Sequence, residues 1–149
     1  MIKRLFIGSD HAGTLFKKKL KAYLETKGYA VTDCGSYEEE KSVDYPDFAH
    51  LVCKNVLAEK ATGVLICGSG IGMSIVANRY PGIRAALCWN AEVAIAARAH
   101  NDANILALGA RFITYETAQA CVEAFLETPF EGGRHQRRVE KIERPCSSK

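Results

Sequence analysis

The residues with the clearest chemical potential lie in the stretch LICGSGIGMSIVANR, residues 65–79. An apolar run ends there at Cys67, and Gly68, Gly70 and Gly72 follow at alternate positions before a helical pattern begins. Glycines between a strand and a helix allow backbone N–H groups to point at an anion, and the helix dipole adds to this attraction. The stretch therefore predicts either an anion-binding loop or only a tight turn.

Three known kinds of phosphate-binding loop do not match this stretch. The dinucleotide fingerprint needs a third glycine where Met73 stands, and an acidic residue after the next strand, where the chain has Cys88 and Trp89. A P-loop needs a Gly-Lys-Ser/Thr sequence, which the chain lacks here. A cysteine phosphatase loop would need arginine in place of Met73. The sequence thus disfavours NAD and points to another anion, such as an enediolate that develops during a reaction.

Cys67 could be the base in such a reaction. A helix N-terminus and backbone N–H donors favour the thiolate form of a cysteine. A thiolate could remove a proton from a carbon next to a carbonyl group. The alternative is a buried cysteine that packs as a small apolar residue, as we expect for Cys53, Cys88 and Cys121 in their apolar patterns.

Three further polar side chains are candidates for the same chemistry. Asp10 and His11 follow the first predicted strand, and each could contact a ligand or could only cap a helix or pack. His100 ends a helical pattern, where it could act as a general acid or base or could only interact with the helix dipole.

The basic character of the chain is concentrated near its end. The whole sequence has a formal net charge of +3, and residues 134–149 contain six Lys or Arg against two Glu. Arg134 and Arg138 lie one helical turn apart, so together with Arg111 they could clamp a phosphate group or could only be surface charges. The cluster is short and has no interleaved aromatic residues, so nucleic-acid binding is disfavoured.

Short apolar runs alternate with helical spacing along the whole chain. The expected elements are strands over 4–10, 29–35, 63–67, 83–88 and 104–109, and helices over 14–28, 47–61, 71–80, 91–101, 114–128 and 134–144. Pro46 suits a helix start, and Asp47 is a possible cap of that helix. This pattern predicts an α/β fold: a three-layer α/β/α doubly wound sandwich with a five-stranded parallel sheet, Rossmann- or flavodoxin-like, and an extra C-terminal helix.

Length and composition predict one cytoplasmic domain. The 149 residues, 48% hydrophobic and 25% charged, suit one domain over 1–149, with 144–149 as a tail. No apolar run is long enough to cross a bilayer, and no signal peptide is recognisable. The six cysteines form no C-x-x-C pair, so we expect free thiols and no metal site. Ligands of such folds bind where the strands end, which is the expected position of Asp10, Cys67 and Arg111.

Six segments occur in an order and at spacings that are typical of one family. They are GSDHAG (8–13), DYPDFA (44–49), GVLICGSGIGMSIVANR (63–79), GIRAALC (82–88), ARAHNDANILALGAR (97–111) and FEGGRHQRRVEKI (130–142). Together they resemble ribose-5-phosphate isomerase of the B type, whose relatives include the galactose-6-phosphate isomerase subunits. The resemblance implies a cofactor-independent aldose–ketose isomerase that interconverts ribose 5-phosphate and ribulose 5-phosphate in the pentose phosphate pathway.

The resemblance also implies a role for each candidate residue. Cys67 would move a proton between carbons 1 and 2 through an enediolate, with Ser69 assisting. His100 would open the sugar ring, with Asp10 as the second residue of that step. The backbone of the glycine loop would hold the enediolate. The residues implied to bind the substrate are Asp10, His11, Tyr45, Gly68, Ser69, Gly70, Ile71, Gly72, Asn101, Arg111, Arg134 and Arg138.

The family assembles its active site from two subunits, so the resemblance implies a homodimer, or a tetramer, with shared sites. No metal, nucleic acid or membrane is expected as a partner. Two alternatives remain open: a hexose-6-phosphate isomerase acting on allose 6-phosphate or galactose 6-phosphate, and a non-catalytic module that binds sugar phosphates. Cys67 together with His100 argues against the module, because a pure binder needs neither a base nor a ring-opening acid.

Overall fold

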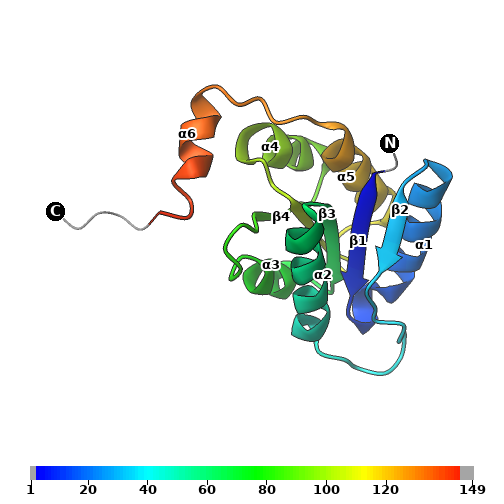
Figure 1. Ribbon diagram of the computed structural model, residues 1–149. Coiled ribbons are helices and arrows are strands. Elements are labelled where there is room, and N and C mark those ends of the chain that lie inside the picture. The colour runs from blue at the N-terminus through cyan, green and yellow to red at the C-terminus, as the bar shows by residue number, and fades with distance from the viewer. Residues whose placement is uncertain (1–2, 145–149) are drawn as a thin grey trace.

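The computed structural model describes residues 3–144 and shows a five-stranded parallel sheet between two layers of helices (Figure 1). The sheet has the order β2-β1-β3-β5-β4, and every neighbouring pair is parallel. The strands are β1 (Arg4–Ser9), β2 (Ala30–Asp33), β3 (Thr62–Cys67), β4 (Ala85–Leu87) and β5 (Ile105–Gly109). This architecture confirms the predicted α/β fold class.

A helix follows each strand, as the sequence predicts. The helices are the 3-10 turn η1 (His11–Gly13), α1 (Thr14–Thr26), α2 (Tyr45–Glu59), α3 (Ile71–Ala77), α4 (Ala91–Asn101), α5 (Tyr115–Glu127) and α6 (Arg134–Glu140). The chain runs from β1 outward to β2 and then returns past β1 to β3, so its winding direction reverses between β1 and β3. The crevice outside such a reversal is the usual ligand site of open α/β sheets.

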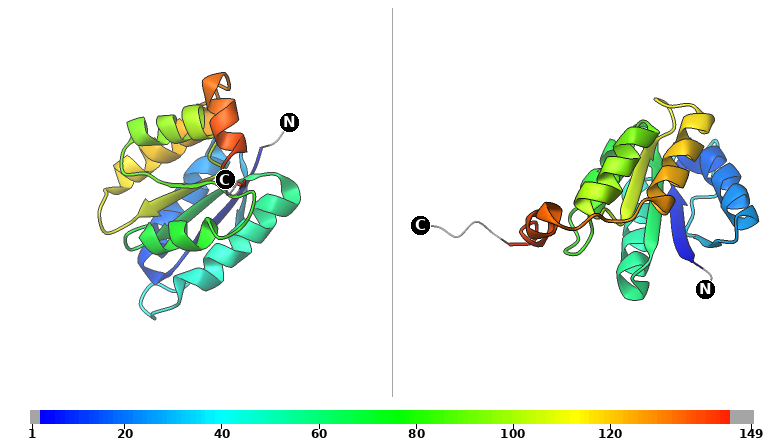
Figure 2. Two further views of the ribbon diagram at one scale, coloured as in Figure 1. Left: turned by 90° about the vertical axis from the view of Figure 1, so that its left-hand side faces the viewer. Right: turned by 90° about the horizontal axis from the view of Figure 1, so that it is seen from above.

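The two faces of the sheet carry separate cores. Side chains of α1, α4 and α5 pack on one face, against strand residues such as Val64 and Ile66. Side chains of α2 and α3 pack on the other face, against Leu65 and Cys67 (Figure 2). Because successive residues of a strand point to opposite faces, β3 supplies both cores, and Cys67 faces the α2–α3 layer.

Two helix boundaries differ from the prediction for identifiable reasons. Helix α2 begins at Tyr45, with Asp44 at the position before it and Pro46 in its first turn, so the prediction that Asp47 caps this helix is wrong. Asp47 lies inside the first turn, where the helix dipole favours a carboxylate. Helix α3 ends at Ala77, because the Asn78 side chain donates to Ala85 O and accepts from Ala85 N, which turns the chain into β4.

Helix α6 projects from the sandwich at the end of an extended segment that leaves α5 and passes α4, and it contacts the end of α4 (Figures 1 and 2). It ends at Glu140 and is therefore shorter than the predicted helix over 134–144. The tail predicted over 144–149, with Cys146, lies outside the described residues apart from Arg144. Between residues 3 and 144, no helix is both long enough and apolar enough to cross a bilayer.

Candidate active site

A cleft of about 560 Å³ opens where β1 and β3 end. Its walls are formed by Asp10, Tyr45, Cys67, Gly68, Ser69, Ile71, Gly72, Ile75, Arg111 and Phe112. Only Ile75 and Phe112 of this set were not predicted from the sequence, and both present exposed apolar side chains at the rim. The parallel strands thus bring together the residues that were expected at their carboxyl ends.

Cys67 lies at the end of β3 with 4% of its surface exposed, and it is the only cysteine of residues 3–144 that lines the cleft. The Gly70 N–H donates to its sulfur, with a nitrogen–sulfur distance of 3.2 Å. This hydrogen bond fixes the sulfur at the start of the glycine loop, at the wall of the cleft.

The other buried cysteines are in a contrasting environment. Burial raises the pKa of Cys53 and of Cys121 to about 11, and burial together with the neighbouring Cys121 raises that of Cys88 to about 12. Each therefore remains a neutral thiol at neutral pH. Their expected role as small apolar residues in the core is confirmed.

The glycine loop is a tight turn that packs directly on the end of β5. Gly70 has φ +76°, and a Cβ on it would lie 2.5 Å from Leu87 Cδ1 and 2.9 Å from the Leu108 carbonyl carbon. Within the loop, Ser69 Oγ accepts from the Ile71 N–H at 3.2 Å. Two N–H groups of the predicted anion-binding loop, those of Gly70 and Ile71, are thus directed at side chains of the cleft itself.

Asp10 caps a helix and also lies at the cleft. Its Oδ1 accepts from the N–H groups of Ala12 at 3.0 Å and Gly13 at 3.3 Å, which caps η1, and its side chain also lines the cleft. His11 lies beside it, and its Nδ1 accepts from the Val43 N–H at 3.2 Å. In the neutral ring this bond places the proton on Nε2, so His11 can donate a hydrogen bond from that atom. The ring is not part of the cleft lining.

Two side chains form walls of the cleft because glycine leaves room for them. A Cβ at Gly68 would lie 3.0 Å from Arg111 Nη1, so the guanidinium packs against the loop backbone. A Cβ at Gly72 would lie 2.5 Å from Cζ of Tyr45, so the Tyr45 ring covers the start of α3. These contacts hold a cation and a hydroxyl group at the cleft, as expected for a site that binds a phosphorylated sugar.

The remaining predicted site residues form a second group, which we call the α4–α6 cluster. It consists of the predicted residues His100, Asn101, Arg134 and Arg138, together with His135, which lies among them. His100 and Asn101 end α4, and in a parallel sheet such a helix returns the chain to the edge where the strands begin. Cys67 lies at the edge where the strands end, so one chain does not bring His100 to Cys67.

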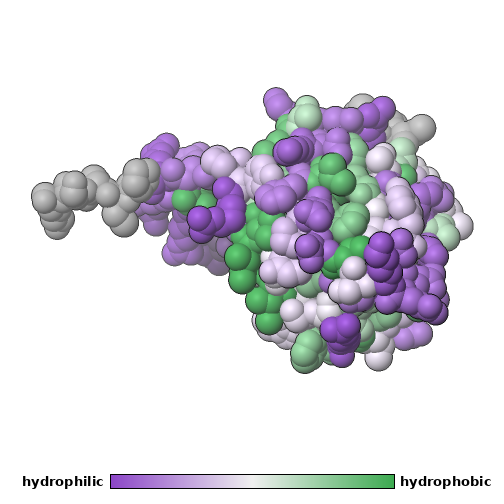
Figure 3. Space-filling view, turned by 90° about the horizontal axis from the view of Figure 1, so that it is seen from below, coloured by the Kyte–Doolittle hydropathy of each residue, from purple (hydrophilic) through white to green (hydrophobic). Residues whose placement is uncertain are grey.

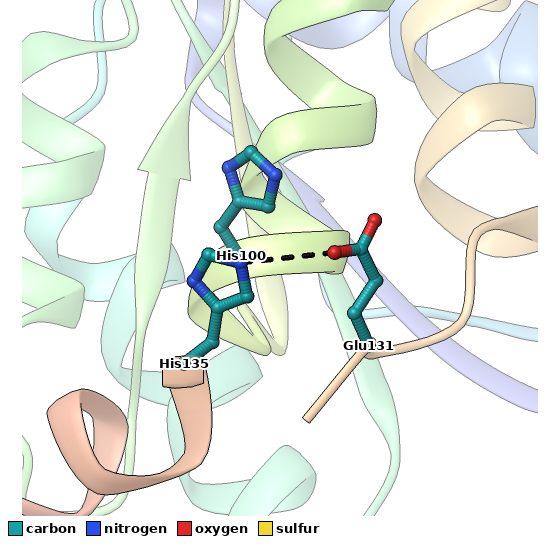
Figure 4. Close-up of side chains that lie close together, drawn as sticks. All are labelled: His100, Glu131 and His135. Carbon is teal, nitrogen blue, oxygen red and sulfur yellow. Dashed lines mark ion pairs between the residues drawn. The ribbon is translucent and has the colours of Figure 1, made fainter. Parts of the chain in front are cut away.

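His135 is the member of the α4–α6 cluster that was not identified from the sequence. Its ring stacks on that of His100, with centroids 4.4 Å apart and planes at 14° (Figure 4). It is 6% exposed, and its Nε2 has no hydrogen-bond partner among the described residues. Burial, with the nearby charges of Arg134 and His100, lowers the pKa of His135 below its usual 6.5. Its position between Arg134 and Arg138 was the available sequence signal.

Comparisons with known proteins agree with this geometry. The Ribose/Galactose Isomerase family matches residues 5–142. Ribose-5-phosphate isomerase B of Escherichia coli is 43% identical over 142 residues, which cover 95% of each chain. The crystal structure of a ribose 5-phosphate isomerase from Thermotoga maritima has a TM-score of 0.92 at 52% identity and covers 96% of this chain and 99% of that chain.

A second solved structure carries a ligand. Ribose-5-phosphate isomerase B of Mycoplasma genitalium with bound ribulose-5-phosphate has a TM-score of 0.92 at 44% identity and covers 97% of this chain and 96% of that chain. Fold, coverage and the matched segments agree with the resemblance drawn from the sequence. The chain belongs to the ribose/galactose isomerase family.

Proposed function

We propose that the protein is a cofactor-independent isomerase that interconverts ribose 5-phosphate and ribulose 5-phosphate. The observation that carries the proposal is the cleft thiol: Cys67, with the Gly70 N–H directed at its sulfur, shares a cleft with Asp10 and Ser69. A relative of the same fold holds ribulose-5-phosphate. We place the reaction in the cytoplasm, as expected for a protein that handles phosphorylated sugars.

The sugar ring must open before the isomerisation. One group removes the proton from the hydroxyl on carbon 1 while another protonates the ring oxygen. The bond between carbon 1 and the ring oxygen then breaks, and carbon 1 becomes an aldehyde. We assign this step to His100, whose imidazole can donate and accept protons near neutral pH, and to Asp10. Neither group needs a cofactor for this step.

Cys67 then carries out the proton transfer between the two carbons. Its thiolate removes the proton from carbon 2, the electron pair forms a carbon–carbon double bond, and negative charge develops on oxygen 1. The thiol returns that proton to carbon 1, and the hydroxyl proton of oxygen 2 moves to oxygen 1 with the help of Ser69. Carbon 1 is thereby reduced and carbon 2 oxidised, with no external oxidant or reductant.

The distance between the two groups of residues supports a homodimer. Since α4 ends at the opposite edge of the sheet from Cys67, His100 would reach the cleft from a second copy of the chain. The α4–α6 cluster would supply Asn101 to the sugar and two arginines to the phosphate, opposite Arg111 and His11.

The surface around the cleft is suited to such a partner. Four large apolar side chains are exposed there: Ile71, Ile75, Trp89 and Phe112, the last with 78% of its surface accessible. Figure 3 faces the side of the sheet where the strands end. It shows hydrophobic residues gathered next to the place where the segment with α6 projects from the rest of the molecule. Exposed apolar surface of this kind is typical of an interface.

The test is a substrate panel on the purified protein, with and without a chelator. We expect rapid turnover of ribose 5-phosphate that the chelator does not lower. Cys67→Ala should abolish turnover and retain binding, because the thiol acts in the chemistry rather than in binding. Cys34→Ala is the matched control, since it removes a thiol outside the cleft.

Each other outcome of the panel has a definite meaning. Preferential turnover of allose 6-phosphate or galactose 6-phosphate would retain the mechanism and reject the pentose as substrate. No turnover of any sugar phosphate, or full activity of Cys67→Ala, would reject the assignment of Cys67 and favour a binding module.

A further inference from the structure

We propose that His100, Glu131 and His135 form a binding site for zinc or a similar divalent transition metal, and that metal bound there withholds His100 from ring opening. One nitrogen from each histidine and one carboxylate oxygen lie within 4.8 Å of one another. Figure 4 shows the two rings and the carboxylate around a common space. The sequence predicted no metal site, because its cysteines lack metal-binding spacing and these three residues lie far apart along the chain.

The donor set is one that zinc prefers. Two imidazoles and one carboxylate hold zinc in many proteins, with bonds of about 2.0–2.2 Å and a fourth position open to water. Ligand atoms around such an ion stand about 3.3–3.5 Å apart, and His135 Nε2 and Glu131 Oε2 are already at 3.7 Å. The His100 and His135 rings are stacked at 14°, so their in-plane nitrogen lone pairs do not yet converge on one point. His100 and Glu131 are exposed, so His100 can rotate out of the stack and Glu131 can follow to complete the site.

His135 provides a second observation that points to a ligand at this site. Its Nε2 is buried and makes no hydrogen bond among the described residues, an arrangement that is unfavourable unless something occupies it. The neutral imidazole of His135 is the form that would bind a metal ion through this nitrogen. The charges of Arg134 and Arg138 oppose a cation, and the Glu131 carboxylate offsets them in part, so we expect moderate affinity.

The backbone holds these ligands in place. The Glu131 N–H donates to Ala99 O at 3.0 Å, which fixes the segment before α6 to the last turn of α4. The His135 N–H donates to Gly132 O at 3.0 Å at the start of α6, and the His135 ring stacks on His100. A metal ion would therefore bind to side chains that are already neighbours, and it would tie α6 to α4.

The consequence for catalysis follows from the lone pair of His100. A ring nitrogen bound to a metal cannot accept a proton, so a metal-bound His100 would be lost as an acid–base group through that atom. This inhibitory effect rests on the proposed function, whereas metal binding itself does not.

The first experiment measures binding to the full chain after removal of metal by a chelator. Zinc is titrated in competition with a chromogenic chelator, and we expect one zinc ion per chain. Glu131→Gln and His135→Gln should each weaken binding at least tenfold. The matched controls are Glu127→Gln and His50→Gln, which make the same changes at exposed residues outside the site and should bind as the wild type does.

Two results would overturn the proposed site. One is equal affinity in Glu131→Gln and Glu127→Gln; because Glu131 is exposed, this variant is expected to fold. The other result comes from replacing zinc with cobalt(II), whose absorption spectrum reports its ligands. Cobalt(II) bound by nitrogen and oxygen lacks the intense charge-transfer absorption of a thiolate ligand. Strong absorption of that kind would show that a thiol, such as Cys67, holds the metal instead.

The second experiment measures isomerisation of ribose 5-phosphate with added zinc. Zinc should inhibit the wild type, a chelator should restore activity, and Glu131→Gln should resist inhibition. Zinc binding without inhibition would overturn the effect on His100. No activity in the metal-free wild type would instead reject the proposed function and leave the binding result intact.

Discussion

Cys67 and the core cysteines differ in the environment of their sulfur atoms. Cys67 ends its strand at a cleft and receives a hydrogen bond from the Gly70 N–H. Cys53 and Cys121 are enclosed by apolar side chains that penalise the thiolate. All three are nearly inaccessible to water, so we expect any difference in their reactivity to follow the environment of the sulfur.

This difference predicts selective alkylation at pH 8. With a pKa of about 11, Cys53 and Cys121 are ionised in only about one molecule in a thousand at that pH. Iodoacetamide should therefore modify Cys67 first among these three, as measured by peptide mass spectrometry over time. Labelling in urea, where all the thiols are exposed, is the control. Equal rates for Cys53 and Cys67 in the folded protein would show that the cleft does not activate its thiol.

At the scale of elements, we expect the glycine loop to link stability to catalysis. Alanine at Gly70 would be strained at positive φ and would collide with Leu87 and the β5 backbone. We expect Gly70→Ala to destabilise the fold by about 2–5 kcal/mol, from backbone strain plus overpacking. It should also reduce kcat, because the N–H directed at Cys67 moves.

Gly28→Ala is the matched control for this substitution. Gly28 also has a positive φ, of +89°, but a Cβ there would meet nothing within 4 Å. We expect it to lose only about 1–2 kcal/mol and to keep its kcat. Urea unfolding and steady-state kinetics measure both quantities. Similar losses in the two variants would mean that close packing of the loop has no special importance.

Helix α6 is expected to contribute binding rather than chemistry. Arg138→Ala should raise KM for ribose 5-phosphate about 10- to 100-fold with a smaller change in kcat, as for loss of one charged hydrogen bond to phosphate. Arg137→Ala removes the same charge from another face of the helix and should leave KM nearly unchanged. An unaltered KM in Arg138→Ala, or equal effects in both variants, would argue against the phosphate clamp.

The elements themselves could be predicted well from local patterns, and the early end of α3 has a tertiary cause. Helix α4 has the predicted bounds, and the Asn90 side chain caps its start by accepting from the Val93 N–H. Helix α3 ends early because Asn78 pairs with Ala85, a contact that no local pattern reveals. The position of β5 between β3 and β4 likewise depends on how the helices pack, not on the strand sequences alone.

At the scale of the whole molecule, the cleft and the α4–α6 cluster differ in how far they could be predicted. The cleft could be located because residues after parallel strands meet at one edge of a sheet, which brings Asp10, Cys67 and Arg111 together. The neighbourhood of His100 could not, because the contact with His135 and Glu131 depends on the docking of α6 against α4.

The central claim is that one active site takes residues from two copies of the chain. Cys67 lies where the strands end, and His100 lies near where they begin. A homodimer of a variant that lacks either residue should be inactive, because both of its sites then lack that residue. In a mixed dimer of Cys67→Ala and His100→Ala, one of the two sites receives both intact residues. Random exchange of subunits should therefore restore about a quarter of the wild-type activity in a two-fold symmetric dimer.

The most direct measurement is this complementation. The two inactive proteins are mixed, unfolded together and refolded, and mass spectrometry under native conditions verifies that mixed dimers form. We predict recovery of about a quarter of the wild-type turnover of ribose 5-phosphate in the mixture, and none when either variant is refolded alone. Mixed dimers that form without any recovery of activity would contradict the shared site.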